Sequence, residues 1–113
     1  MNSTQSTVKI AQHTPGPWKA TYGNDMSISI VAPGNAVYDE LSICRVSAKD
    51  NSKEREQNAR LIASAPELLE ALEDILLGAE AYAKTVTNPE YRAMWDGQLA
   101  KARSAIARAE GRG

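Results

Sequence analysis

The sequence predicts an α+β fold, in which a short antiparallel β-meander of about three strands is followed by a short helix and a long antiparallel helical hairpin. Three observations support this prediction. Apolar and polar residues alternate along short segments before residue 47, as they do in strands with one buried face. Glycine, proline and asparagine separate these segments, which is typical of tight turns. After residue 50, apolar residues recur at three- and four-residue steps, which indicates amphipathic helices.

The chain length of 113 residues predicts a single domain. We expect residues 1–12, which are polar, to form a flexible lead-in to a domain over 13–113, with the sheet in 13–48 and the helices in 51–110. The chain has no phenylalanine and only 5% aromatic residues, so its core must consist mainly of Leu, Ile, Val and Ala. Such a core is thin in a domain of this size, and this favours a homo-oligomer.

Composition also excludes several classes of protein. The net charge of −1 argues against a general nucleic-acid-binding protein, which normally has a basic excess. With Cys44 as the lone cysteine, the chain can form no intrachain disulfide, as expected in a reducing cytoplasm. No segment approaches the roughly 20 apolar residues of a membrane span, and the first twelve residues lack the apolar core of a signal peptide.

The first two expected strands form a β-hairpin. The prolines of segment 13–18 fix a turn, and a strand over 18–22 follows. Its alternation puts Trp18, Ala20 and Tyr22 on one face. A Gly-Asn-Asp turn at 23–25 leads to a strand over 26–31, with the inward-facing residues Met26, Ile28 and Ile30. Alternation of this kind predicts one buried and one solvated face.

A third strand is clearest over 41–46, after a turn at 32–35. Its alternation puts Leu41 and Ile43 on one face, and Cys44 and Val46 on the other. Three short neighbouring strands are most simply a meander, and the buried face of a meander needs a covering element.

Capping signals divide the second half into three helices. Asn51 with Glu54 resembles a capping box for a helix over 53–63, whose inward residues are Ala59, Leu61 and Ile62. The segment 64–67, Ser-Ala-Pro-Glu, forms a second capping box that restarts the helix, although the two could also be one bent helix. Asn88-Pro89-Glu90 caps a third helix. The second and third helices are expected to pack as an antiparallel hairpin.

No residue pattern indicates catalysis, so we do not expect an enzyme. His13 is the single histidine, and no second group that could orient it is evident. Cys44 has no second cysteine or nearby histidine, which favours a strand residue over a nucleophile. The spacings of metal-binding motifs and of a phosphate-binding loop are absent. We therefore expect no catalytic residue, no metal and no cofactor.

Binding is better supported, and the candidate ligand-binding residues are Trp18, Arg45, Asn58 and Arg60. Trp18 is either a core aromatic or a stacking platform for a planar base. Arg45, Arg55 and Arg60 are either solvated or converge on a phosphate near a helix N-terminus. Asn58 and Arg60 lie two residues apart on a helix, so only one of them can face a given ligand unless the other serves a neighbouring chain.

The third expected helix contributes two further features. Trp95 lies at a seam position, where it packs in the hairpin or between subunits rather than in a site. The helix also has a basic face, formed by Arg92, Lys101, Arg103 and Arg108. Basic residues are favourable toward a helix C-terminus, and the alternative is an acidic partner surface.

Two segments of the chain resemble a family of small bacteriophage and prophage proteins. Residues 13–18 read His-Thr-Pro-Gly-Pro-Trp, and residues 58–72 read Asn-Ala-Arg-Leu-Ile-Ala-Ser-Ala-Pro-Glu-Leu-Leu-Glu-Ala-Leu. The likeness extends from His13 to the Ala-Glu-Gly ending of the third helix. At the level of architecture, an N-terminal antiparallel sheet followed by two long helices resembles the Thoeris anti-defence sponges, which are oligomeric phage proteins that sequester cyclic ADP-ribose-type signals or cyclic oligonucleotides.

The resemblance implies a counter-defence protein in the host cytoplasm. The first hypothesis is a sponge that holds a phosphorylated nucleotide signal in pockets between subunits, with Trp18 stacking and Arg45 and Arg60 binding phosphates. The second is an anti-CRISPR-like inhibitor that binds a host defence protein through its helices. A third is a phage accessory protein without an inhibitory role.

Overall fold

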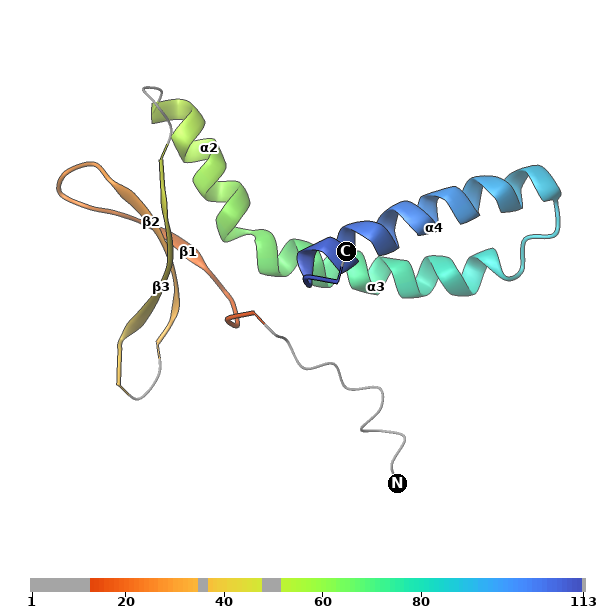
Figure 1. The fold of residues 1–113 in the computed structure, drawn as a ribbon, viewed down its shortest axis with the longest axis horizontal. Coiled ribbons are helices and arrows are strands. Elements are labelled where there is room, and N and C mark those ends of the chain that lie inside the picture. The colour runs from red at the N-terminus through yellow and green to blue at the C-terminus, as the bar shows by residue number, and fades with distance from the viewer. Residues whose placement is uncertain (1–12, 35–36, 48–51, 113) are drawn as a thin grey trace. The chain divides into compact units, whose positions relative to one another are not determined.

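The computed structural model describes residues 13–34, 37–47 and 52–112, so the expected lead-in over 1–12 lies outside the described residues. Three strands precede three helices, which confirms the predicted α+β class (Figure 1). The elements are β1 (Lys19–Tyr22), β2 (Ile28–Pro33), β3 (Glu40–Val46), α2 (Ser52–Ala63), α3 (Ala65–Ala83) and α4 (Pro89–Ala109). The chain divides into two compact units after Pro66. The first holds the sheet and α2, and the second holds the helical hairpin.

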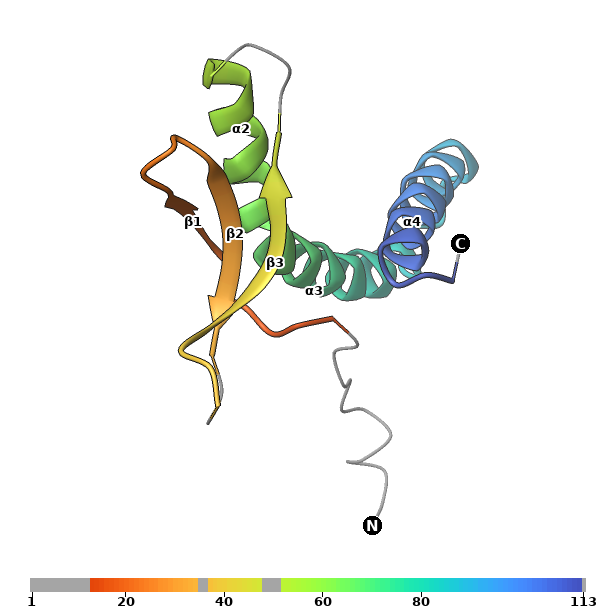
Figure 2. The same cartoon turned by 60° about the vertical axis from the view of Figure 1, so that its left-hand side comes forward.

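The sheet is an antiparallel meander in the order β1-β2-β3, with β2 in the centre (Figure 2). A tight turn joins β1 to β2, closed by hydrogen bonds from the Gly23 N–H to the Ser27 carbonyl (2.9 Å) and from the Met26 N–H to the Gly23 carbonyl (3.0 Å). Met26 has a left-handed φ of 68° in this turn and is exposed. The prediction that Met26 faces the core is therefore wrong, because Met26 belongs to the turn. Tyr22, at the end of β1, is also exposed.

An irregularity in the pairing of β2 with β3 changes which residues of β3 face inward. Ile30 pairs with Cys44 but Val31 pairs with Ser42, so Ile43 is an extra residue in β3. A bulge of this kind locally breaks the strict alternation of faces. As a result, Ile43 and Cys44 both pack against the core. The prediction that these two residues lie on opposite faces is wrong for this reason.

The core of the first unit lies between the sheet and α2. Its buried residues are Ile28, Ile30, Val46 and Ala59. Residue Ala59 is small, which lets the helix approach the central strand closely, and Ile62 packs beside it one turn later. Leu61, which the sequence analysis placed inward, is 64% exposed. It lies two residues after Ala59, about 200° around the helix, and so faces away from the sheet.

The segment before β1 holds Trp18 at the edge of this core. The indole N–H of Trp18 donates to the carbonyl of Thr14 at 3.0 Å, and the imidazole of His13 meets the indole edge to face, with 6.2 Å between ring centroids. The Gly16–Pro17 peptide between them is cis. Trp18 is half-buried and packs against the core residues. The Pro-Gly-Pro turn therefore closes one end of the sheet–helix core.

The first and second expected helices are separate helices. α2 ends at Ala63, where the N–H of Ser64 bonds to the carbonyls of Arg60 and Leu61, and α3 begins at Ala65. This break agrees with the expected restart at the Ser-Ala-Pro-Glu segment. The capping box predicted at Asn51 lies outside the described residues.

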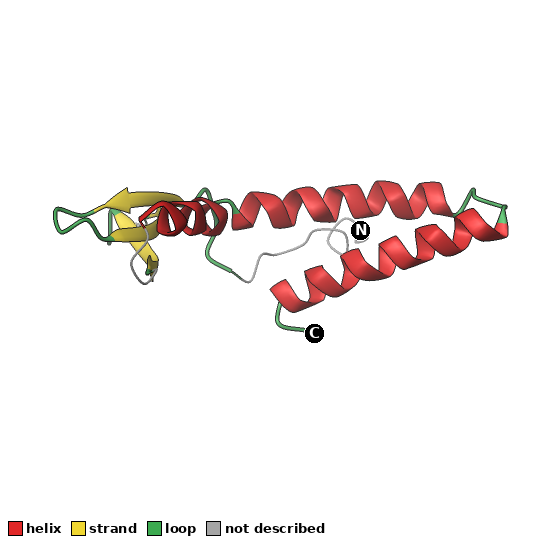
Figure 3. Cartoon of the chain, turned by 90° about the horizontal axis from the view of Figure 1, so that it is seen from above, coloured by secondary structure: helices red, strands yellow, loops and turns green. Residues whose placement is uncertain are grey.

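The second unit is an antiparallel pair of helices, α3 and α4 (Figure 3). As predicted, Asn88 caps α4, with its side-chain oxygen accepting from the N–H groups of Glu90 (2.9 Å) and Tyr91 (3.3 Å). Tyr82 and Trp95 form an edge-to-face pair across the two helices, with 5.5 Å between ring centroids. Among the residues described in this unit, only Ala83, Leu99 and Ile106 are fully buried.

Candidate ligand-binding hollow

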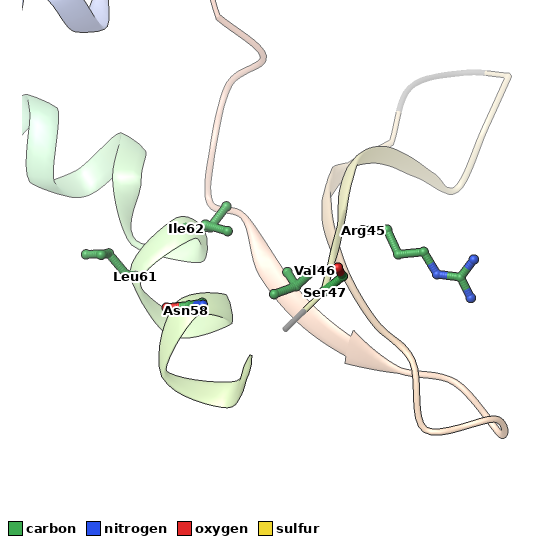
Figure 4. A pocket seen from close by; sticks show the side chains of 6 residues that line it. All are labelled: Arg45, Val46, Ser47, Asn58, Leu61 and Ile62. Atoms are coloured by element: carbon green, nitrogen blue, oxygen red, sulfur yellow. The ribbon is translucent and has the colours of Figure 1, made fainter. Parts of the chain in front are cut away.

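An open hollow of about 460 Å³ lies in the first unit, between the end of β3 and one side of α2 (Figure 4). Six residues line it, namely Arg45, Val46, Ser47, Asn58, Leu61 and Ile62. β3 ends at Val46, and Val46 and Ser47 form one side of the hollow, while Asn58, Leu61 and Ile62 of α2 line the other side. Its volume falls in the range of small-molecule sites, about 300–1,000 Å³.

The lining has an apolar part and a polar part. Val46, Leu61 and Ile62 supply aliphatic surface, and Leu61 is exposed despite its size. Asn58 adds an amide, which can donate and accept hydrogen bonds at the same time, and Ser47 adds a hydroxyl. Aliphatic walls with one amide and one hydroxyl suit a flat, partly apolar ligand with a polar edge.

The side chain of Arg45 points away from the hollow. Figure 4 shows it directed away from Asn58, Leu61 and Ile62. The reason is strand alternation, because its neighbour Val46 is buried against α2 and Arg45 must face the other side of the sheet. There its guanidinium pairs with the carboxylate of Asp25 at 3.4 Å, with both side chains exposed. The backbone of Arg45 therefore lies at the hollow with Asn58. Its guanidinium lies on the opposite side of the sheet.

The carboxylate of Asp25 has a lowered pKa. Hydrogen bonding from Ser27 is the main cause, including the Ser27 N–H at 3.1 Å, and Arg45 adds a smaller attraction. A carboxylate with a folded pKa below its unfolded value of 3.8 stabilises the fold above that value. The contribution is lost as the pH falls through the lower folded pKa.

We therefore expect the Asp25 carboxyl to titrate below 3.8 in a pH series of side-chain carboxyl NMR spectra. In Ser27→Ala, which removes the hydroxyl but keeps the N–H, the pKa should rise toward the ordinary value. Arg45→Gln should raise it less, since the arginine is the smaller cause. A larger effect of Arg45→Gln than of Ser27→Ala would contradict this order.

The two other predicted site residues lie outside the hollow. Arg60 is exposed on another side of α2 and pairs with Glu56 at 3.7 Å. Trp18 packs against the core, and its indole N–H is already occupied by Thr14. Of the four candidates, the structure places Asn58 and the strand position of Arg45 at the hollow, and it does not bring Trp18 or Arg60 there.

Arg55 is the arginine with unsatisfied hydrogen-bonding capacity on the inner side of α2. Its Nε is buried and has no hydrogen-bond partner in the described part of the chain. It lies one turn before Asn58 and two turns before Ile62, so these three residues follow one side of the helix. The three- and seven-residue spacing was visible in the sequence, where Arg55 appeared only as one of three arginines at the sheet–helix junction. A buried unpaired N–H in a native structure calls for a partner such as water or an ion.

Within residues 13–34, 37–47 and 52–112, no three His, Cys, Asp or Glu side chains cluster as metal ligands would. The imidazole Nδ1 of His13 lies 2.9 Å from the Thr14 carbonyl oxygen. Among the helices described, none is long and apolar enough to cross a membrane.

Fold and site together define a small α+β protein with an open hollow beside its sheet–helix core. The whole chain, residues 1–113, matches the model of a family described as Salmonella phage P22 protein Y8K6. The protein belongs to this bacteriophage family. No curated protein and no solved structure matched the chain.

Proposed function

We propose that this phage protein is a counter-defence factor that sequesters a nucleotide-derived immune signal in the host cytoplasm, without catalysis. The observation that supports it is the hollow beside α2, which has an aliphatic wall and the amide of Asn58. Arg55 is outside the lining but lies one turn before Asn58 on the same side of the helix. A nucleotide presents a flat base, a hydrogen-bonding edge and a phosphate. These three parts correspond to the wall, the amide and the guanidinium.

In this proposal Arg55 binds the phosphate, in place of Arg45 and Arg60. Arg45 and Arg60 already pair with carboxylates and point elsewhere. Arg55 has a buried N–H without a partner, and a charge-assisted hydrogen bond to a phosphate would satisfy it. Membership of a bacteriophage family is compatible with a role against host defence. The resemblance to Thoeris anti-defence sponges suggests cyclic ADP-ribose isomers, cyclic dinucleotides and cyclic trinucleotides as the first ligands to test.

The test is a thermal-shift panel of these three ligand classes on the purified full-length chain. A ligand at a hundredfold over its dissociation constant adds about 2.7 kcal/mol of stability. This corresponds to a rise of several degrees in Tm for a protein of this size. A shift with one class, confirmed by calorimetry at a fixed stoichiometry and recovery of unaltered ligand, supports sequestration. Chemical conversion of the bound ligand would contradict it.

Two pairs of matched variants on α2 locate the binding. Asn58→Ala should weaken binding about three- to tenfold by loss of a hydrogen bond, and its control is the neighbouring Gln57→Ala, outside the lining. Arg55→Gln should weaken binding by at least about tenfold, and its control is Arg60→Gln, which removes an exposed charge from the same helix. Equal losses in variant and control would rule out this hollow as the site.

The protein-binding inhibitor is the second candidate, and it is favoured by the large apolar side chains that the helical hairpin exposes. A well-folded protein that shows no shift with any ligand class would overturn the sequestration proposal. Tight association with a purified host defence complex would then establish the inhibitor in its place.

A further inference from the structure

Apart from Leu77, the helical hairpin exposes five large apolar side chains. In α3 these are Leu68, Ile75 and Tyr82, which are 52%, 67% and 57% exposed, and in α4 they are Tyr91 and Met94, at 61% and 54%. The three residues of α3 are seven apart, so they form one stripe along the helix. Exposed apolar side chains that are scattered need no explanation, whereas contiguous ones mark interaction sites.

Two contacts between α3 and α4 show that the apolar residues of both helices lie on the same face of the hairpin. On one edge of the seam, Tyr82 of α3 meets Trp95 of α4. On the opposite edge, Glu80 pairs with Arg103 at 2.7 Å. Leu68 and Ile75 continue the Tyr82 stripe, and Tyr91 lies one turn before Trp95 on the same side of α4. The apolar side chains therefore flank the aromatic edge of the seam, away from the ion pair.

The apolar face of α3 is too wide for a single neighbouring helix. Its half-buried residues Leu69, Leu72 and Leu76 face α4, while the stripe from Leu68 to Tyr82 lies beside them. Together they cover about 140° of the helix at 100° per residue. A narrow stripe is typical of a two-helix seam, and a wide one is typical of a helix that packs on more than one neighbour.

The second unit also has little core of its own. It comprises 47 residues, Glu67–Gly113, and its fully buried residues in the described part are Ala83, Leu99 and Ile106. Chains of this size rarely gain enough stability from one small core and often use oligomerisation instead. The five side chains expose on the order of 500 Å², taking about 200 Å² for a large side chain. With a polar rim, this area approaches the roughly 800 Å² per partner of a stable interface.

We propose that this face binds the same face of a second copy of the chain, so that the two hairpins form a four-helix bundle. Such bundles are built from antiparallel neighbours around a shared apolar core. In this dimer the stripe of Leu68, Ile75 and Tyr82 is buried against the partner chain. The proposal does not depend on the ligand-binding function, because none of these residues lines the hollow.

Charge selects the arrangement of the two copies. α3 has five acidic residues and no basic one, whereas α4 has four basic residues and two acidic ones. The apolar face is bordered by Glu67 and Asp74 on the α3 edge and by Lys101 and Arg108 on the α4 edge. All four are exposed, and none has an ion pair in the described chain.

A twofold axis parallel to the helices puts each α3 beside the α4 of the other copy, with acidic edges against basic ones. Because the hairpin is antiparallel, Glu67 and Arg108 both lie near its open end, and Asp74 and Lys101 lie about two turns further in. Rotation about this axis leaves the position of each residue along the helices unchanged. Glu67 therefore meets Arg108 of the second copy, and Asp74 meets Lys101 of the second copy. The other twofold arrangement puts α3 against α3 and brings like charges together, which is unfavourable.

The first test is the mass of the full-length chain by light scattering and sedimentation equilibrium. We expect twice the chain mass of 12.2 kDa. Ile75→Glu puts a carboxylate at the centre of the face and should weaken dimerisation at least about a hundredfold, since burying an unpaired charge is costly. Leu77→Glu is the matched control, because Leu77 is 68% exposed in the same helix but lies on its acidic side. It should leave the mass unchanged.

The second test reverses charges at the border of the apolar face and leaves the apolar side chains unchanged. Asp74→Lys should weaken the dimer several-fold, because it opposes Lys101 of the second copy. Adding Lys101→Asp in the same chain should restore the affinity to within about twofold. A wild-type monomer would overturn the proposal, as would a dimer that Ile75→Glu and Leu77→Glu affect equally. Failure of the double variant to rescue Asp74→Lys would overturn the arrangement.

Discussion

Ile30→Ala should destabilise the first unit by about 2–4 kcal/mol. Ile30 is 0% exposed and lies at the centre of the central strand, packed with Ile28, Val46 and Ala59. Truncation removes apolar contacts and leaves a cavity, and β2, held between two strands, has little freedom to collapse into it. The loss is large relative to the stability of a small protein, which is about 5–15 kcal/mol.

Urea denaturation followed by tryptophan fluorescence measures this loss. The chain has one tryptophan in each unit, Trp18 beside the sheet and Trp95 in the hairpin. In a Trp95→Phe background the signal comes from Trp18 alone and so reports the first unit. The control is Leu61→Ala, which truncates an exposed residue of α2 and should change stability by less than about 0.5 kcal/mol. Equal losses for the two variants would contradict the position of the core.

Gly34→Ala should destabilise the same unit by about 1–3 kcal/mol. Gly34 follows β2, where the chain of Tyr38 and Asp39 passes directly over it. A Cβ at this position would collide with the carbonyl oxygen of Tyr38 and the carbonyl group of Asp39. These are backbone atoms and cannot rotate aside, so the substitution must displace the connection that sets the pairing of Pro33 with Glu40.

Gly97→Ala is the matched substitution, and it should raise the free energy of unfolding rather than lower it. Gly97 lies within α4, and an added Cβ would meet nothing within 4 Å. Glycine in a helix interior costs about 0.5–1 kcal/mol relative to alanine, so this variant should stabilise the hairpin by that amount. Both variants are measured by urea denaturation, with Trp18 reporting Gly34→Ala and Trp95 reporting Gly97→Ala. A neutral Gly34→Ala would show that the connection after β2 moves at no cost.

The elements of the fold were predictable because their signals are local. Alternation located the strands, and Asn88 with Pro89 located the start of α4 to the residue. The errors arose where a non-local pairing decides the face. Ile43 faces the core because β3 is bulged against β2, and no pattern within β3 itself reveals the bulge. Leu61 was assigned inward as an apolar residue next to Ile62, although helical geometry turns it to the side.

The candidate site was predictable only in part. Asn58 was identified, and it lines the hollow. Arg45 was chosen for its charge, but alternation along β3 directs that charge to the opposite side of the sheet, where Asp25 holds it. Arg55 shares one side of α2 with Asn58 and Ile62. The three arginines carry the same charge, so charge alone does not show which of them lies on the same side as Asn58. The position of each arginine around its helix or along its strand does.

The meander topology has a consequence for how the chain folds. Each strand pairs with its neighbour in sequence, and the helix that covers the sheet follows the last strand directly. α3 and α4 are likewise joined by a short connection. Contacts between segments close in sequence require little loop closure, and proteins rich in them reach the native state quickly. The sheet can form by successive addition of strands, and the hairpin needs no residue from the first unit to begin forming. Such a chain can acquire its structure in the order in which a ribosome releases it.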